Sequence, residues 1–183
     1  MAALPQPAIP ALDKPYGILI TGVGGTGVVT IGALLGMAAH LEGKGGSVLD
    51  MAGLAQKGGS VYSHVRLAPA PDDIHAVRIA AGEARLVIGC DMIVAASDEA
   101  IAKMQSGFTR AVINSDVATT GGFTKDPDLQ LPYAGMKDAI REACGGESVD
   151  FVDASGLATA LMGDSIATNL FMLGYAYQKG LVP

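Results

Sequence analysis

The fold is decided by one stretch, Gly17–Leu41, which reads GILITGVGGTGVVTIGALLGMAAHL. Its first five residues form a short apolar run that stops at a glycine, which is typical of a buried strand. The residues Gly22–Gly27 then predict a tight loop. The run Val28–Leu41 is apolar nearly all round, which predicts a buried helix. A strand, a glycine loop and a helix in this order predict an α/β fold.

The rest of the chain continues the same alternation. Further strands are expected at residues 47–50, 61–67, 91–96, 111–114 and 150–153. Helices are expected at residues 98–105, 136–144 and 162–179. Strands that alternate with helices predict one three-layer α/β/α domain, Rossmann-like, with a mostly parallel sheet of five or six strands. This domain is expected to span residues 16–183, and the Pro-rich residues 1–15 to be a linker or the edge of an excised fragment.

Composition excludes several classes of function. The 183 residues carry a net charge of −6 and show no basic stripe, so no nucleic-acid partner is expected. No apolar run reaches about 18 residues, so no membrane span is expected. The N-terminus lacks the pattern of a secretory signal, and the two cysteines are far apart in sequence. We therefore expect a cytoplasmic protein with reduced thiols. The high apolar content is compatible with an interface such as that of a homodimer.

The glycine loop is the first candidate binding site. Its G-x-G-x-x-G pattern follows a strand and opens a helix, where backbone N–H groups can hold a phosphate. The candidate cofactor-binding residues in the loop are Gly22, Gly24, Gly25, Thr26 and Gly27. Alternatively, the glycines only allow the strand and helix to pack closely. Asp50, at the end of the next expected strand, either holds a ribose hydroxyl or caps a turn, and we favour the cap.

A second glycine segment joins two of the expected strands. It reads MAGLAQKGGS over residues 51–60 and carries one cation beside two glycines. Such a segment can present a charge and bare N–H groups to a carboxylate, a phosphate or a partner's cofactor. Alternatively, it is a loop with a solvated lysine. Its candidate cofactor-binding residues are Gln56, Lys57, Gly58 and Gly59.

Several other polar residues are given structural roles. His64 lies in the strand expected at 61–67, on the wetter of its two faces, without further ligands at metal spacing. Cys90 is expected to be a small buried side chain rather than a nucleophile. Ser155 and Ser165 have no paired histidine, so serine hydrolase chemistry is not expected. The sequence therefore predicts neither a metal site nor a catalytic residue in this chain.

The combined motifs resemble the gamma-type domain of 2-oxoacid:ferredoxin oxidoreductases. That family has a glycine loop after the first strand, then a Gln-Lys/Arg-Gly-Gly loop, then a strand ending in Val-Arg. Here the matching segments are Gly22–Gly27, Gln56–Ser60 and Val65-Arg66. Asp91-Met92-Ile93-Val94 stands where the family has an Asp-led strand, and Asn169 and Leu173-Gly174 match its C-terminal helix. The sequence of residues 51–59 resembles that of the indolepyruvate branch.

This resemblance implies a component that is inactive alone. The family oxidatively decarboxylates 2-oxoacids to acyl-CoA and passes electrons to ferredoxin, using thiamine diphosphate and iron–sulfur clusters. The chain has neither a thiamine-binding segment nor a set of cluster cysteines, so the resemblance assigns those cofactors to partner domains or subunits. It implies that the chain itself binds no cofactor firmly but contacts coenzyme A. The alternative is a stand-alone nucleotide- or CoA-binding module.

Overall fold

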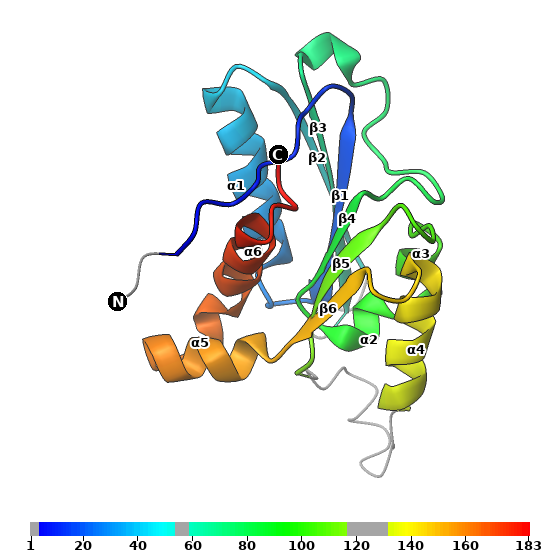
Figure 1. Ribbon diagram of the computed structural model, residues 1–183, viewed down its shortest axis with the longest axis vertical. Helices are drawn as coiled ribbons and strands as arrows, with labels where there is room; N and C mark the ends of the chain where they lie inside the picture. The colour runs from blue at the N-terminus through cyan, green and yellow to red at the C-terminus, as the bar shows by residue number, and fades with distance from the viewer. Residues whose placement is uncertain (1–3, 54–58, 117–131) are drawn as a thin grey trace.

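The computed structural model describes residues 4–53, 59–116 and 132–183. They form one six-stranded sheet in the order β2-β3-β1-β4-β5-β6, with helices on both faces (Figure 1). The strands are β1 (Tyr16–Val23), β2 (Gly45–Ala52), β3 (Ser60–Ala68), β4 (Leu86–Gly89), β5 (Arg110–Asn114) and β6 (Val149–Val152). The predicted α/β fold with five or six strands is thus confirmed.

Only β3 runs against the other strands. It pairs antiparallel with β1 on one side and β2 on the other, whereas β1, β4, β5 and β6 pair in parallel. The reason lies in the connections. The strand β2 ends at Ala52, and the next strand, β3, begins at Ser60. This connection is too short for the crossover that a parallel pair needs. The sheet is therefore mostly parallel, as predicted, with one reversed strand.

The helices divide into two layers. One layer holds α1 (Val28–Leu41), α5 (Ala154–Met162) and α6 (Thr168–Gln178), and the other holds α2 (Met92–Ala95), α3 (Asp98–Ile101) and α4 (Tyr133–Cys144). Alternate residues of β1 feed the two cores: Ile18 and Ile20 pack with the first layer, and Leu19 packs with the second. Short 3₁₀ turns occur at Pro71–Asp73 and Ser165–Ala167.

The prediction of a strand at residues 91–96 was wrong. The strand is β4, which ends at Gly89, and the segment after it is the short helix α2. Asp91 starts this helix, because its side chain accepts a hydrogen bond from the N–H of Val94 at 2.9 Å. A short apolar run fits a buried strand and a buried helix equally well, so only the cap distinguishes them.

The single helix expected at residues 162–179 is divided. Gly163 ends α5 in a left-handed conformation, and Asp164 caps the 3₁₀ turn through the N–H of Ile166. The helix α6 then begins at Thr168, while α5 was not predicted at all. Likewise, the short helix α3 is capped by Ser97 and ends at Ile101, whereas the expected helix reached Gln105. Gly163 breaks the helical pattern because it supplies the left-handed residue at which helices end.

Two predictions of burial were also wrong. The helix α1 is not buried all round: Val28, Ile31, Gly32, Leu35 and Ala39 face the core, and the opposite side is exposed. His64, expected on a wet face, is fully buried. Its Nδ1 accepts a hydrogen bond from the N–H of Ile79 at 3.2 Å, because the segment containing Ile79 covers that face of β3.

Asp50 does not stand at a strand end. It lies within β2, opposite Ser63 of β3, and its side chain is exposed. The strand β3 separates β2 from β1, so Asp50 is not on the neighbour of the strand that leads into the glycine loop. The turn-capping role that we favoured for Asp50 is therefore wrong, and the order of strands removes the basis for the ribose-binding role as well.

Candidate functional site

A polar crevice lies at the carboxyl ends of β1, β4, β5 and β6. It has a volume of about 240 Å³. The crevice is lined by Gly25, Thr26, Cys90, Asn114, Asp116, Ser155, Ser165, Ile166 and Thr168. The chain leaves β1 toward the layer of α1 and leaves β4 toward the layer of α2, so β1 and β4 flank the point where the connections change face. Open α/β sheets bind their ligands at such a point.

The glycine loop supplies one wall of this crevice through Gly25 and Thr26. Gly25 is exposed and has a φ of 99°, a conformation that a glycine adopts without strain. The hydroxyl of Thr26 donates to the carbonyl of Val23 at 2.7 Å, which holds the loop against the end of β1. No described side chain caps the N-terminus of α1, and its first turn has no acid. The free N–H groups there can receive an anion.

Gly22 and Gly27 have packing roles. Gly22 is buried, and a Cβ there would lie 2.3 Å from the Thr26 hydroxyl oxygen. Gly27 has a φ of 79°, and a Cβ there would lie 2.0 Å from Nδ2 of Asn169. That amide nitrogen donates to the carbonyl of Gly27 at 3.4 Å, which ties the start of α6 to the loop. The close-packing interpretation of the loop thus holds for Gly22 and Gly27, whereas Gly25 lines the crevice, where ligand contact stays a prediction.

The two glycine segments meet through their backbones. The N–H of Gly24 donates to the carbonyl of Gly59 at 2.9 Å, and the N–H of Gly53 donates to the carbonyl of Ser60 at 2.9 Å. Gly24 and Gly59 are therefore neighbours at the carboxyl end of β1. The other predicted residues of the second segment, Gln56, Lys57 and Gly58, lie outside the described residues.

Asn114 organises the opposite wall. Its Nδ2 donates to the carbonyl of Cys90 at 3.2 Å and to the hydroxyl of Ser155 at 3.0 Å. Its Oδ1 accepts from the N–H groups of Ala154 at 3.1 Å and Asp116 at 3.3 Å. A single side chain, only 2% exposed, thus joins the ends of β4 and β5 to the start of α5. Such a fully bonded amide fixes the shape of the crevice.

The crevice offers recognition rather than a reactive group. Burial, aided by the negative charge of Asp91, raises the pKa of the Cys90 thiol to about 12, so this sulfur stays protonated and is a poor nucleophile. The remaining polar side chains are hydroxyls, an amide and the carboxylate of Asp116, and Ile166 is apolar. Among the described residues, no cluster of three His, Cys, Asp or Glu side chains could hold a metal ion. Within the same part of the chain, no helix is long and apolar enough to cross a membrane.

Sequence reasoning missed several residues of this crevice. Asn114 was expected only as the end of a strand, and Ser155 and Ser165 were considered as nucleophiles but not as crevice residues. Asp116 and Thr168 were not singled out. Asn114 did carry a signal, because a polar residue that ends an apolar run in a parallel sheet stands at the edge where ligands bind. Ser155, Ser165 and Thr168 carried none, because Ser155 lies in the first turn of the unpredicted helix α5, and Ser165 and Thr168 reach the crevice through the division between α5 and α6.

A crevice at the switch point, with a helix N-terminus that no described side chain caps, is the arrangement with which open α/β domains recognise a ligand. The chain matches the family described as pyruvate ferredoxin/flavodoxin oxidoreductase over residues 17–183. The chain belongs to this family, as the gamma-type component of a 2-oxoacid:ferredoxin oxidoreductase. The resemblance seen in the sequence is confirmed, and the reading as an enzyme component is supported over a stand-alone module.

Curated relatives are archaeal. The chain is 32% identical over 164 residues to "Indolepyruvate oxidoreductase subunit IorB" of Thermococcus kodakarensis, which covers 88% of this chain and 76% of the relative. It is 29% identical over 161 residues to the protein of the same name from Methanothermobacter thermautotrophicus, covering 88% of this chain and 77% of the relative. The family match over residues 17–183 includes both glycine segments and the C-terminal helices.

Solved structures share the fold. Pyruvate oxidoreductase subunit PORC of Thermotoga maritima has a TM-score of 0.61 at 18% identity, with 93% of this chain and 80% of that chain covered. The 2-oxoglutarate:ferredoxin oxidoreductase of Magnetococcus marinus, solved with 2-oxoglutarate, coenzyme A and succinyl-CoA bound, has a TM-score of 0.63 at 17% identity. That match covers 90% of this chain and 24% of the other. The fold therefore occurs both in a separate subunit and as a part of a longer chain.

Proposed function

We propose that this chain is the gamma-type component of an indolepyruvate-type enzyme, acting in the cytoplasm. The enzyme would oxidatively decarboxylate an aryl pyruvate to its acyl-CoA and reduce ferredoxin. The observation that carries this proposal is the 32% identity with an indolepyruvate oxidoreductase subunit over 88% of the chain. Thiamine diphosphate and iron–sulfur clusters would reside in partner domains or subunits, because the chain has only two cysteines, both buried.

The chain's own part would be to hold one portion of coenzyme A. Anionic groups would lie against the N–H groups at the start of α1, next to Gly25 and Thr26. Hydroxyl and amide groups of the ligand would face Ser155, Ser165 and Thr168. The carboxylate of Asp116 makes the far wall unsuited to a second phosphate. A crevice of about 240 Å³ is smaller than a usual pocket for a drug-sized ligand, so most of coenzyme A would lie outside it.

The second glycine segment would contact the ligand or the partner from beside the glycine loop. Gly59 accepts a hydrogen bond from Gly24, which makes the segment a neighbour of the glycine loop. The cation of Lys57 would then add an attraction for phosphate. This role of Gln56, Lys57, Gly58 and Gly59 is a proposal from the sequence motif and the position of Gly59.

The function is tested by activity of the assembled enzyme. Reduction of methyl viologen, in place of ferredoxin, should require both coenzyme A and a 2-oxoacid, with indolepyruvate preferred to pyruvate and 2-oxoglutarate. The purified chain alone should turn over none of them. A preference for pyruvate would refute the indolepyruvate assignment. A clear thermal shift of the chain with NAD(H) or FAD, but not with coenzyme A, would instead support a nucleotide enzyme.

The site is tested by a pair of variants that differ only in charge. Ser165 is exposed on the rim of the crevice, so both Ser165→Asp and Ser165→Asn should fold. The aspartate should repel the anion and raise the KM for coenzyme A roughly tenfold, which corresponds to about 1.4 kcal/mol. The asparagine should change it much less, and neither variant should change the KM for the 2-oxoacid. Equal KM values for coenzyme A in both variants would place the ligand elsewhere.

A further inference from the structure

One helical layer of the molecule has no charged residue in its helices. The sequences of α1, α5 and α6 contain no Asp, Glu, Lys or Arg. The helix α4 in the opposite layer reads YAGMKDAIREAC and carries four such residues on its solvent side and flanks. A surface helix normally presents charged and polar residues to water. The layer of α1, α5 and α6 therefore differs from an ordinary solvated surface.

This uncharged layer also exposes large apolar side chains. Met37 is 58% exposed, Leu161 is 70% exposed and Met162 is 71% exposed. The other exposed apolar residues of the layer are Val29, Leu34, Leu41, Leu157, Ile166, Leu170 and Tyr177. Together they expose on the order of 1,000 Å², whereas the largest apolar patch of a monomer covers about 300–600 Å² and each side of a standard interface about 800 Å².

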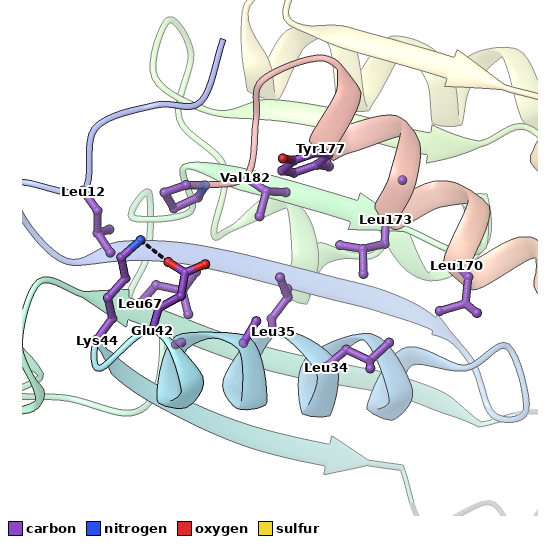
Figure 2. Close-up of a pocket in the computed structure, with 14 residues that line it drawn as sticks. Leu12, Leu34, Leu35, Glu42, Lys44, Leu67, Leu170, Leu173, Tyr177 and Val182 are labelled. Atoms are coloured by element: carbon purple, nitrogen blue, oxygen red, sulfur yellow. Dashed lines mark ion pairs between the residues drawn. The ribbon is translucent and has the colours of Figure 1, made fainter. Parts of the chain in front are cut away.

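The layer is continuous and hollowed. The helix α6 packs against both α1 and α5. Between α1 and α6 lies an apolar groove of about 490 Å³, into which Leu34, Leu35 and Leu173 project (Figure 2). The only ion pair drawn there joins Glu42 to Lys44 at 2.6 Å, at one end of the groove. The exposed carboxylates of Asp153 and Asp164 flank α5, so a partner seated on this face would meet charge at the ends of α5 but none within α1, α5 and α6.

The layer reaches the rim of the polar crevice. Ile166, between α5 and α6, is 82% exposed and also lines the crevice. A partner that covers α5 and Ile166 would therefore form a further wall of the crevice. The crevice by itself is too small to enclose coenzyme A. This continuity favours, as occupant, the component that shares the ligand.

We infer that the face formed by α1, α5 and α6 is the permanent docking surface for the thiamine- and cluster-bearing component of the same oxidoreductase. The matching face of that component is apolar and uncharged, because a charge buried against these helices would have no partner. The size and the lack of charge fit an obligate rather than a transient interface. The partner closes the coenzyme A crevice over Ile166. This inference rests on the proposed function.

Hydroxyl-radical footprinting of the assembled enzyme tests the face. Met37 and Met162 are exposed in this chain, whereas Met172 is 0% exposed. We expect Met37 and Met162 to be oxidised as slowly as Met172, while Tyr133 on α4, 40% exposed, is oxidised readily. Oxidation of Met37 and Met162 at least ten times faster than Met172 would overturn the inference. If the same preparation decarboxylates 2-oxoacids, the proposed function would still stand.

Identity of the occupant is tested by substitution. Leu161→Lys should lower the yield of assembled enzyme at least fivefold, whereas Glu142→Lys on the other layer should not. Leu161→Cys, carrying a photoreactive thiol probe, should cross-link to peptides of the catalytic component; the native Cys90 and Cys144 are buried and should not react. Cross-links to a second copy of this chain, or normal assembly of Leu161→Lys, would refute the inference.

Discussion

At the scale of single residues, the glycine motif combines a packing residue, Gly27, with a residue that lines the crevice, Gly25. Gly27 is a glycine because of its φ of 79° and because Asn169, 142 residues later, fills the space of its Cβ. The contact with Asn169 is a packing contact and involves no ligand. The residue therefore fixes the entry into α1 by packing, and Gly25, two residues earlier, is left to face the crevice.

Gly27→Ala should lower the free energy of unfolding by about 2–5 kcal/mol. The left-handed conformation costs about 1–2 kcal/mol for an alanine, and overpacking against Asn169 adds about 1–3 kcal/mol. Gly43→Ala is the matched control, since Gly43 has a φ of 69° and no atom within 4 Å of its Cβ position. It should lose about 1–2 kcal/mol, as measured by urea unfolding. Equal losses would show that Asn169 moves aside without cost.

His64 should make stability depend on pH. Its ring is buried, and Nε2 has no hydrogen-bond partner among the described residues. Desolvation lowers the pKa of His64 from 6.5 to about 4. The charges around it act in the order Arg78 (lowers), Lys103 (lowers), Glu99 (raises) and Arg66 (lowers). Because the native state disfavours the proton, the contribution of His64 is fully present above pH 6.5 and is lost as the pH falls toward 4.

Between pH 8 and pH 5, this single group should reduce the free energy of unfolding by about 2 kcal/mol. His64→Asn removes the titration, while its Oδ1 can still accept from the N–H of Ile79. Urea unfolding of both proteins across this range should give curves that converge toward pH 5. Parallel curves would mean that folding does not lower the pKa of His64.

At the scale of elements, the N-cap of α5 sets one wall of the crevice. The side chain of Asp153 accepts a hydrogen bond from the N–H of Gly156 at 2.9 Å. Ser155, which lines the crevice, lies in the turn that this bond closes. The element was not predicted from the sequence, because its small apolar residues lack a strong helical period. Its position depends on the cap and on the bonds from Asn114.

Asp153→Ala should cost about 1 kcal/mol, because the first turn of α5 loses its cap. Asp153→Asn keeps an oxygen that can accept the same hydrogen bond. It should therefore lower the free energy of unfolding by only a few tenths of the amount lost in Asp153→Ala. Thermal unfolding of the two variants separates them. A similar melting temperature for both, well below that of the parent, would mean that the carboxylate charge matters and not the cap.

At the scale of the whole molecule, the two ends of the chain are fastened to each other across one core. The hydroxyl of Tyr16, at the start of β1, donates to the carbonyl of Leu181 at 2.8 Å. Gln178 donates to the carbonyl of Pro5 at 2.6 Å, so the N-terminal segment runs along α6 (Figure 1). The assignment of residues 1–15 as a linker stays a prediction, but residues 4–15 contact the domain.

Tyr16→Phe should lower the free energy of unfolding by about 1–2 kcal/mol, because it leaves a buried carbonyl without its donor. Burial also raises the pKa of Tyr16, which agrees with a protonated, donating hydroxyl. Tyr177→Phe is the control: Tyr177 is 44% exposed, and its loss should be within about 0.5 kcal/mol. Equal stability of both variants in urea would show that the carbonyl of Leu181 finds water instead.

The sequence by itself determined the α/β class, the first strand, the glycine loop and the limits of α1. These features depend on neighbours in the chain: an apolar run, glycines at fixed spacing and a helical pattern between them. The motifs also determined the family, because the two glycine segments and the later Val65-Arg66 lie within one matched region. Local preferences suffice where each residue's state is set by those beside it.

Only the tertiary structure decided which residues form the crevice and which face of α1 meets water. Asn114 and Asn169 acquire their roles from partners 24 to 142 residues away, which no local pattern encodes. Likewise, the helix or strand state of residues 91–96 depended on a single cap. The apolar residues of α1, α5 and α6 exceed what one sheet face can bury, so their second, exposed side appears only once the layers are assembled.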